Sequence, residues 1–170
     1  MRVLFVTSEC APLFKRGGLG DVSHSLPVAL QAAGVNISVA MPYYEAVKSE
    51  HVRCTGQLAV DFDGRRELVF VFEARIPGSK VPVLLFRHPQ LNNYISASMT
   101  HAFAFFSRAV AQFFLYADAD GGGPFDIVHC NDWHTALVPL LLGEVRKKER
   151  PRGQTLESRH SKTILTIHNL

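Results

Sequence analysis

The sequence has 170 residues, of which 47% are hydrophobic and 19% charged, with a formal net charge of +3. This length is enough for one domain with a packed core, and the composition is that of a globular protein, not of a disordered chain. A net charge this small does not indicate a nucleic-acid-binding protein, so we expect no nucleic-acid partner.

The N-terminal segment predicts a strand, a glycine-rich loop and a helix, in that order. Residues 2–7 form a short apolar, β-branched run, typical of a strand buried on both faces, and residues 21–33 carry an amphipathic helical pattern. The loop between them ends in Lys15-Arg-Gly-Gly-Leu-Gly20. Because free backbone N–H groups at a helix N-terminus bind phosphate, Gly17, Gly18 and the Lys15 ammonium form a candidate phosphate site. The alternative is that the glycines only turn the chain.

Two residues are expected to interrupt or end the predicted helix. Pro27 falls inside the predicted helix, and we expect a kink or a break near Ser25. Gly34 is typical of a helix C-terminus, and residues 35–41 predict a second buried strand. Strand, helix and strand in succession predict parallel pairing with a right-handed crossover.

The rest of the sequence predicts more strands and helices. Residues 58–62 and 67–74 flank Asp63-Gly64, which indicates a β-hairpin, either an insertion or an edge of the main sheet. The remaining predicted elements are a strand at 81–86, a helix at 102–116, a flexible loop at 121–124, a strand at 125–130, a helix at 133–144 and a strand at 163–167. The sum is a doubly wound α/β domain with a mostly parallel, Rossmann-like sheet and a β-hairpin insertion.

Polar residues follow the predicted strands where each strand ends. Glu9 and Lys15 come after the first strand, Asn131-Asp-Trp-His134 after a later one, and His168-Asn169 after the last. Ligands of open α/β sheets bind outside the carboxyl ends of the strands. The sequence therefore predicts a functional cleft at this edge.

Two enzyme classes must be weighed for such a cleft. A nicotinamide-binding enzyme is suggested by Gly18-Leu-Gly-Asp-Val-Ser23, but an acid should then end the second strand, where the sequence has Ala40-Met-Pro42. A metal hydrolase would use Asp132, His134 and His168, although their spacing matches no ligand motif. We therefore expect no metal site and no cofactor.

Neither the cysteines nor the hydrophobic runs indicate secretion or membrane insertion. Cys10, Cys54 and Cys130 lie far apart, which argues against a disulfide scaffold and favours a reducing compartment. The N-terminal apolar run is too short for a signal peptide, and no segment predicts a membrane span. We expect no membrane partner and a cytoplasmic location in a bacterium, or a plastid location if the source is a plant or an alga.

Four blocks of the sequence resemble, in register, bacterial glycogen synthases and plant starch synthases. The first block consists of Glu9, Pro12, Lys15-Arg-Gly-Gly-Leu-Gly-Asp-Val22, Leu26-Pro27, Ala29-Leu30 and Pro42-Tyr43. The other three are Phe103-Ala-Phe-Phe-Ser-Arg-Ala109, His129-Cys-Asn-Asp-Trp-His134 and Thr166-Ile-His-Asn169. The resemblance covers nearly the whole sequence.

The resemblance implies one half of a GT-B glycosyltransferase, which has two Rossmann-like domains. Residues 1–170 would be the N-terminal, acceptor-side domain in truncated form, with the C-terminal nucleotide-binding domain absent. Family members are retaining hexosyltransferases that move glucose from ADP-glucose, or in some members UDP-glucose, to the non-reducing end of an α-1,4-glucan, without a metal. We expect little or no turnover from these residues alone, because half a cleft cannot exclude water or hold the leaving group on both sides.

The resemblance also implies roles for residues of the glycine-rich loop. Lys15 and the backbone of Gly17 and Gly18 would contact the donor phosphates, since fixed donors and cations stabilise a departing diphosphate. Asp21, in the catalytic set, would lie near the sugar or the acceptor. Its alternative role is to favour the helix N-terminus by its charge.

On the acceptor side, the resemblance implies that Asp132 lines the acceptor site and that His168 lies against the transferred glucose, both as catalytic residues. Glu9, His134 and Asn169 complete the expected substrate-binding set.

The sequence departs from the family pattern in two places, and each departure leads to a structural prediction. The segment Pro89-Gln-Leu-Asn-Asn93 is shorter than the family loop before the Phe103 block, so the acceptor-side loop should differ. The last predicted strand lacks covering elements, which predicts an exposed part of the sheet and self-association. A second interpretation therefore stays open: a non-catalytic module that binds glucan or complements a separate C-terminal half.

Overall fold

The computed structural model describes residues 1–49, 51–95, 98–119, 125–148 and 161–168. Within these ranges the elements, in chain order, are β1 (Arg2–Val6), α1 (Gly18–Ala32), β2 (Asn36–Pro42), β3 (Arg53–Phe62), β4 (Arg65–Arg75), β5 (Pro82–Arg87), η1 (Pro89–Leu91), α2 (Met99–Ala119), β6 (Ile127–Asn131), η2 (Trp133–Thr135), α3 (Val138–Lys148) and β7 (Lys162–Thr166).

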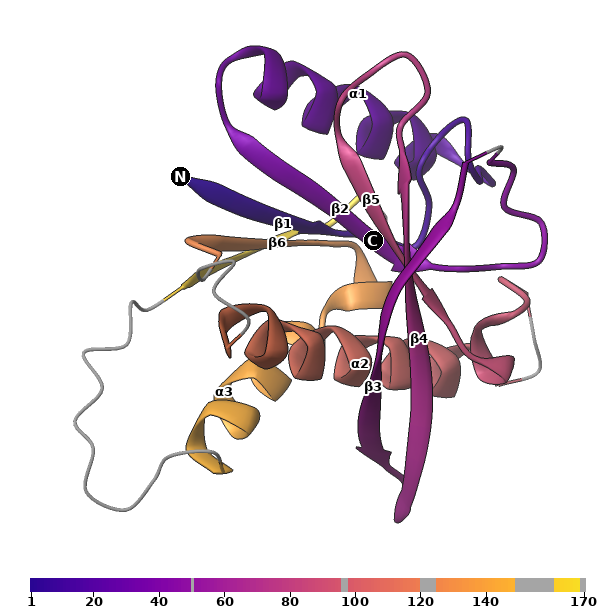
Figure 1. Ribbon diagram of the computed structural model, residues 1–170, viewed down its shortest axis with the longest axis vertical. Helices are drawn as coiled ribbons and strands as arrows, with labels where there is room; N and C mark the ends of the chain where they lie inside the picture. The colour runs from indigo at the N-terminus through magenta and orange to yellow at the C-terminus, as the bar shows by residue number, and fades with distance from the viewer. Residues whose placement is uncertain (50, 96–97, 120–124, 149–160, 169–170) are drawn as a thin grey trace.

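The described strands form one seven-stranded sheet in the order β3-β4-β5-β2-β1-β6-β7. From β5 to β7 all neighbours are parallel, whereas β4 is antiparallel to β5 and β3 is antiparallel to β4. Helix α1 covers one face, and α2 and α3 cover the other (Figure 1). The predicted doubly wound α/β fold is confirmed, and the hairpin forms an edge of the main sheet.

Strand β1 is buried on both faces, as its sequence predicts. Side chains alternate across a strand, so Leu4 and Val6 pack into the cluster on the α2 face, whereas Val3 and Phe5 pack into the cluster on the α1 face. All four are at most 4% exposed. Because β1 sits between β2 and β6, the residues that follow it enter the middle of the carboxyl edge.

Helix α1 begins at Gly18, within the glycines, and runs without a break through Pro27. A proline lacks the N–H that would donate to the carbonyl four residues earlier, here that of Ser23. The buried thiol of Cys10 donates to this carbonyl at 3.2 Å instead. Of the expected kink or break near Ser25, the break is wrong, because a side chain from the preceding loop satisfies the freed acceptor.

Two predicted turns are confirmed by their backbone angles. Gly34, at φ +85°, closes α1, and the N–H of Val35 donates to the carbonyl of Leu30 at 3.0 Å. Asp63 and Gly64 both have positive φ, 50° and 70°, which is the geometry of a two-residue hairpin turn. Strands β3 and β4 extend well beyond the predicted ranges.

The single helix predicted over residues 133–144 is wrong in its first part. The structure has the short turn η2 and then α3, which begins at Val138. In a helix that started at Trp133, Pro139 would break the bond to the carbonyl of Thr135, whereas a proline in the first turn of a helix is tolerated. The predicted loop at 121–124 lies outside the described residues. No helix in the described part of the chain is long and apolar enough to span a bilayer.

The buried aromatic residues of α2 should carry much of the stability. Phe106 is 0% exposed and packs edge-on against Phe86, so we expect Phe106→Ala to lower the free energy of unfolding by about 3–5 kcal/mol. Phe70 is 40% exposed, and Phe70→Ala should cost less than about 1 kcal/mol. Urea denaturation of both variants measures the difference, and equal losses would contradict this description of the core.

Candidate functional site

The carboxyl end of β1 leads into a compact loop that packs on the first turn of α1. Cys10 and Phe14 exchange two backbone hydrogen bonds of 2.9 Å, and the N–H of Ala11 donates to the carbonyl of Gly20 at 3.0 Å. A Cβ at Gly20 would lie only 2.9 Å from Cγ of Lys15. This close approach requires glycine at position 20. We call residues 14–20 the glycine loop.

Glu9 hydrogen-bonds through its side chain to the backbone of the glycine loop. Its side chain is 3% exposed, and Oε2 accepts hydrogen bonds from the N–H groups of Arg16 at 2.5 Å and Gly17 at 2.9 Å. Because Gly17 has no side chain to cap α1, the Glu9 carboxylate is the anion at this helix N-terminus. The Gly17 N–H, which we predicted to bind phosphate, is thus paired with Glu9. A Cβ at Gly17 or Gly18 would meet no atom within 4 Å, so both glycines face open space.

Lys15 and Asp21 face each other above the loop. The Lys15 ammonium lies 2.8 Å from Oδ1 and 2.6 Å from Oδ2 of Asp21. Both side chains are about half exposed, at 47% and 59%. Lys15, predicted to contact the donor phosphates, and Asp21, predicted to lie near the sugar or the acceptor, therefore form one solvent-exposed ion pair.

The turn after β6, residues 131–136, has a strained backbone at Asp132. This residue has φ +63° and ψ 176°, a region that costs about 1–3 kcal/mol for a residue other than glycine. Its N–H donates to the carbonyl of Thr166 at 2.8 Å, and its Oδ1 accepts the N–H of Trp133 at 2.9 Å. With 1% exposure, Asp132 is buried. Strain of this kind, held by surrounding hydrogen bonds, is concentrated at functional sites.

Tyr94 joins the glycine loop to the turn after β6. Its hydroxyl donates to Oε1 of Glu9 at 3.2 Å and lies 3.0 Å from Nε2 of His134. Since the single hydroxyl proton goes to Glu9, the second bond requires His134 to donate from Nε2. The opposite ring nitrogen, Nδ1, is then an acceptor, and it is buried without a hydrogen-bond partner among the described residues.

Burial is the main reason that both rings of this link are neutral. Burial lowers the pKa of His134 below its ordinary value of 6.5, although the nearby carboxylates of Asp132 and Glu9 act in the opposite direction. Burial and the charge of Glu9 raise the pKa of Tyr94 to about 12. A neutral imidazole and a neutral phenol therefore lie between two carboxylates.

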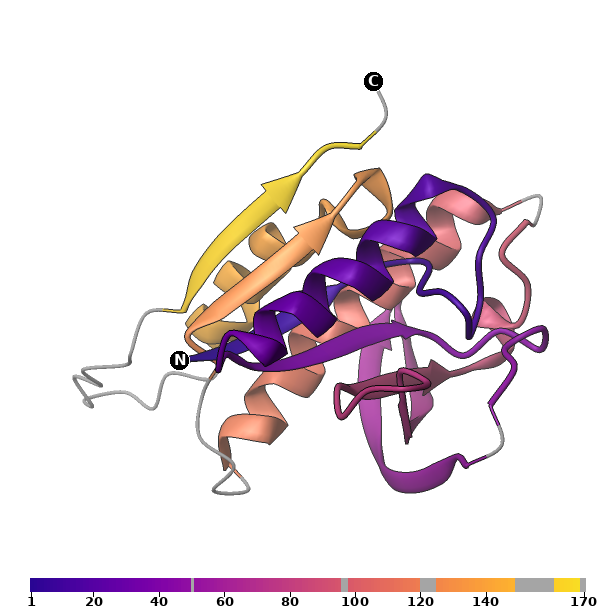
Figure 2. The same ribbon diagram turned by 90° about the horizontal axis from the view of Figure 1, so that it is seen from above.

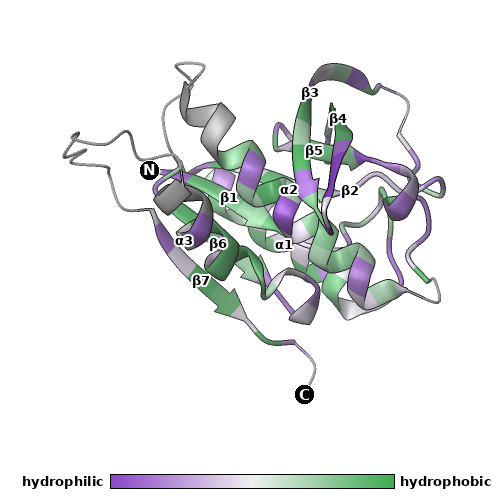
Figure 3. Cartoon of the chain, turned by 90° about the horizontal axis from the view of Figure 1, so that it is seen from below, coloured by the Kyte–Doolittle hydropathy of each residue, from purple (hydrophilic) through white to green (hydrophobic). Residues whose placement is uncertain are grey.

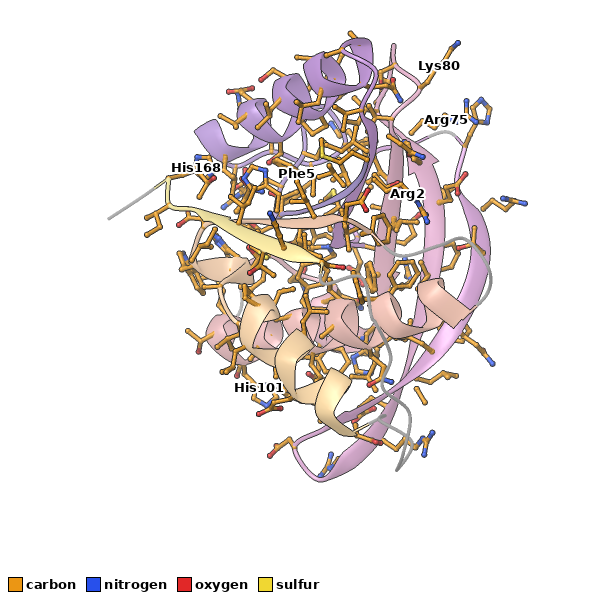
Figure 4. The ribbon with its side chains drawn as sticks, turned by 90° about the vertical axis from the view of Figure 1, so that its left-hand side faces the viewer. Arg2, Phe5, Arg75, Lys80, His101 and His168 are labelled. Atoms are coloured by element: carbon orange, nitrogen blue, oxygen red, sulfur yellow. The ribbon has the colours of Figure 1, made fainter. Side chains whose placement is uncertain are left out.

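His168 lies at the carboxyl end of β7, and its Nε2 is 3.1 Å from Oδ1 of Asn131 (Figure 4). Asn131 is fully buried, and its amide nitrogen also donates to the carbonyl of Val6 at 3.2 Å. His168 is thereby tied to the ends of β6 and β1. Asn169, the other residue predicted at this position, lies outside the described residues.

The predicted site residues that the structure describes thus gather at one edge of the sheet. Glu9 and Tyr94 connect the glycine loop to His134 and Asp132, while His168 is held separately through Asn131. In the described part of the chain, no three His, Cys, Asp or Glu side chains are placed to hold a metal ion.

The sequence did not point to Tyr94. It directly follows the short segment of residues 89–93 that departs from the family pattern, and the polar run Asn92-Asn-Tyr94 comes shortly after the carboxyl end of the parallel strand β5. This position could have identified Tyr94 as a candidate site residue, because loops at the carboxyl edge of such sheets carry ligand-binding residues.

Comparison with known proteins identifies the family of this chain. Residues 2–170 match the family model described as the starch synthase catalytic domain. The chain belongs to this family. Glycogen synthases from Gloeobacter violaceus and Paracidovorax citrulli are 38% and 36% identical to it, over all of this chain but only 33% and 34% of their own lengths.

A solved structure shows the same fold. The catalytic domain of starch synthase IV from Arabidopsis thaliana, bound to ADP and acarbose, superposes with a TM-score of 0.81 at 28% identity. The match covers 98% of this chain and 34% of that one. The chain therefore spans about a third of the length of these relatives.

The glycine loop should tolerate a side chain at one glycine but not at another. Gly20→Ala places a Cβ against Lys15 and, at 3.3 Å, against Oε2 of Glu9, so we expect a loss of about 1–3 kcal/mol in the free energy of unfolding. Gly18→Ala has open space and should cost nothing or stabilise α1. Chemical denaturation compares the two, and an unaffected Gly20→Ala variant would contradict the packing described here.

The buried histidines should make the fold sensitive to mild acid. His134 and His129 both have a pKa below 6.5 in the folded chain, mainly because of burial. The unfolded chain then binds protons more readily, so the free energy of unfolding should fall as the pH drops below 6.5, by at most about 1.4 kcal/mol per pH unit and histidine. His134→Gln should reduce this slope between pH 7.5 and 5.5, whereas His51→Gln, at an exposed position, should not. Equal slopes in wild type and His134→Gln would refute the assignment.

Proposed function

We propose that this chain forms the acceptor-side half of a cleft that transfers glucose from ADP-glucose to the non-reducing end of an α-1,4-glucan. The observation that supports this most directly is the joining of the glycine loop to His134 through Glu9 and Tyr94, in a chain of the starch synthase family. The Arabidopsis relative is bound to ADP and to acarbose, which supports a nucleotide-sugar donor and a glucan-like acceptor.

On the donor side, Lys15 would change partners during binding. A diphosphate carries the same kind of charge as the Asp21 carboxylate, and it would compete for the Lys15 ammonium that Asp21 now holds. Asp21, once released, would face the sugar or the acceptor. The N–H groups at the start of α1, near Gly17 and Gly18, would add a positive dipole end beside the leaving group.

On the acceptor side, Glu9 and His134 would support the substrate-binding surface from within, because the Glu9 oxygens already accept three hydrogen bonds and Nδ1 of His134 is buried. The strained backbone of Asp132 fixes this turn against β7, and Asp132 would line the acceptor site. We assign His168 to the face of the transferred glucose and Asn169 to the same end of the site. The glycogen synthases named above are bacterial proteins, which supports a bacterial cytoplasmic location, with a plastid as the alternative for a plant or algal source.

A glucan-binding module is the second candidate, and one observation favours it. Trp133 is 44% exposed, and its ring stacks on His134 with a centroid distance of 4.1 Å, so part of an aromatic surface is open to a sugar ring at the rim of the site. Such a surface can retain glucan without catalysis.

Transfer is best tested in a chimera of residues 1–168 with the part of the Gloeobacter violaceus glycogen synthase beyond the matched third. We expect incorporation of labelled glucose from ADP-glucose into glycogen, and a loss of about 100-fold in kcat for Lys15→Ala, since one charge contact to the leaving group is removed. Lys80→Ala, at an exposed lysine away from the cleft (Figure 4), should leave the rate within about twofold of the parent. Unchanged activity of the Lys15 variant would contradict the proposed role.

Glycogen affinity electrophoresis of the 170-residue chain separates the two candidates. We expect Trp133→Ala to reduce retardation by glycogen and Leu140→Ala, at a 64% exposed position, to leave it unchanged. Strong retardation of the chain together with an inactive chimera would favour the binding module over the transferase.

A further inference from the structure

Asn131 is a fully buried polar residue at the carboxyl end of β6. Its side chain is 0% exposed. Strands β6 and β7 lie side by side (Figure 2), and both are mainly hydrophobic (Figure 3). Burying an amide among apolar strands costs free energy unless its hydrogen-bonding groups find partners. The partners of this amide therefore show what the residue does at the edge of the sheet.

The two ends of the Asn131 amide can be told apart by what they contact. Nδ2 lies 3.2 Å from the carbonyl oxygen of Val6, at the end of β1, and 3.2 Å from that of His129. Since a carbonyl oxygen only accepts hydrogen bonds, the atom facing both carbonyls must be the NH₂ group. The opposite atom is then the amide oxygen Oδ1, which lies 3.1 Å from Nε2 of His168.

This orientation determines where the His168 ring carries its proton. An amide oxygen has no hydrogen, so the bond to Asn131 requires Nε2 of the imidazole to donate. In the neutral ring, the single N–H is then on Nε2, and Nδ1 is an acceptor. The amide cannot rotate to reverse these roles, because its oxygen would then face the carbonyls of Val6 and His129.

Asn131 also determines on which face of the sheet the imidazole lies. Val128 packs into the cluster on the α2 face, and side chains alternate along a strand, so Asn131 points to the α1 face. The ring of His129, which shares that face, lies 5.0 Å from Phe5 of the α1-side cluster. The ring of His168 is therefore held on the face that α1 covers, at the edge where the glycine loop leads into that helix.

We propose that Asn131 is a positioning residue of this site, which acts through His168 by fixing the orientation and the tautomer of the imidazole. With Nε2 held by the buried amide, the ring meets a sugar hydroxyl group as an acceptor, through Nδ1. An imidazole that rotated freely would offer either nitrogen, so the reactive geometry would be present only part of the time. The catalytic consequence rests on the proposed function, whereas the fixed tautomer does not.

The ¹⁵N chemical shifts of the His168 ring test the fixed tautomer in the 170-residue chain, without turnover. Measured well above the ordinary histidine pKa of about 6.5, they should show the proton on Nε2 alone. In Asn131→Ala, they should move toward the shifts of His51, an exposed histidine that serves as the reference for a solvated ring.

Two further variants separate this contact from a general loss of stability. Asn131→Asp keeps an oxygen toward the imidazole, so the proton of His168 should stay on Nε2. Val128→Ala removes buried methyl groups from the same strand on the α2 face, and it should leave the His168 shifts unchanged. Circular dichroism verifies that each variant is folded under the conditions of the measurement.

The chimera of residues 1–168 with the Gloeobacter violaceus remainder tests the consequence for transfer. We expect Asn131→Ala to lower kcat by about tenfold or more, because a misplacement of about 1 Å at the reacting sugar is enough for such a loss. Val128→Ala should stay within about twofold of the parent. In a His168→Ala background, Asn131→Ala should lower kcat by less than about twofold, since the group that it positions is already gone.

Two results would overturn the proposal. One is a neutral His168 ring that carries its proton on Nδ1, or that has the same shifts in the wild-type chain and in Asn131→Ala. The other is an equal loss of kcat from Asn131→Ala with and without the His168 imidazole, which is the result of a purely structural role. An inactive parent chimera together with the expected shifts would reject the proposed transferase function and still support the positioning of His168.

Discussion

The arrangement of the site depends on one buried carboxylate. Glu9 accepts the N–H groups of Arg16 and Gly17, and it receives the hydroxyl proton of Tyr94. Without it, the start of α1 would have no anionic cap and the glycine loop no fixed point beneath it. The charge of Glu9 also adds to the burial that raises the pKa of Tyr94 and opposes the burial that lowers the pKa of His134, so one residue fixes the loop and acts on both neighbouring rings.

The rest of the fold places this carboxylate where a ligand can use it. Strand β1 is central and buried on both faces, so the chain leaves it at the middle of the carboxyl edge. The Cys10 thiol fixes the following loop to the proline-containing helix through the carbonyl of Ser23. After the neighbouring strand β6, Asp132 has a strained, positive φ angle, and its N–H donates to the carbonyl of Thr166 at the end of β7. The strained backbone of Asp132 and the hydrogen bond from the Cys10 thiol to a helix carbonyl both occur at the candidate site.

Periodicity and turn residues were enough to predict the parallel sheet, the hairpin at Asp63-Gly64 and the gathering of polar residues at one edge. They failed where a distant side chain decides the outcome, as at Pro27, since no local pattern reveals that a thiol will replace the lost hydrogen bond. Tyr94 was missed for the same reason: its role arises from contacts with residues far away in the sequence. The hydrogen bond between the N–H of Gly17 and Glu9 could not be predicted from the sequence either, because a helix N-terminus binds a carboxylate as well as a phosphate.

The protonation of His134 tests the central claim most directly, namely that Glu9 organises the site through Tyr94. The ¹⁵N chemical shifts of its ring distinguish the two neutral tautomers from the imidazolium. We predict a neutral ring at pH 7 with the proton on Nε2, and a shift of the tautomer balance in Tyr94→Phe, which loses the hydroxyl acceptor. A charged ring, or a proton on Nδ1 in the wild-type chain at pH 7, would contradict the account.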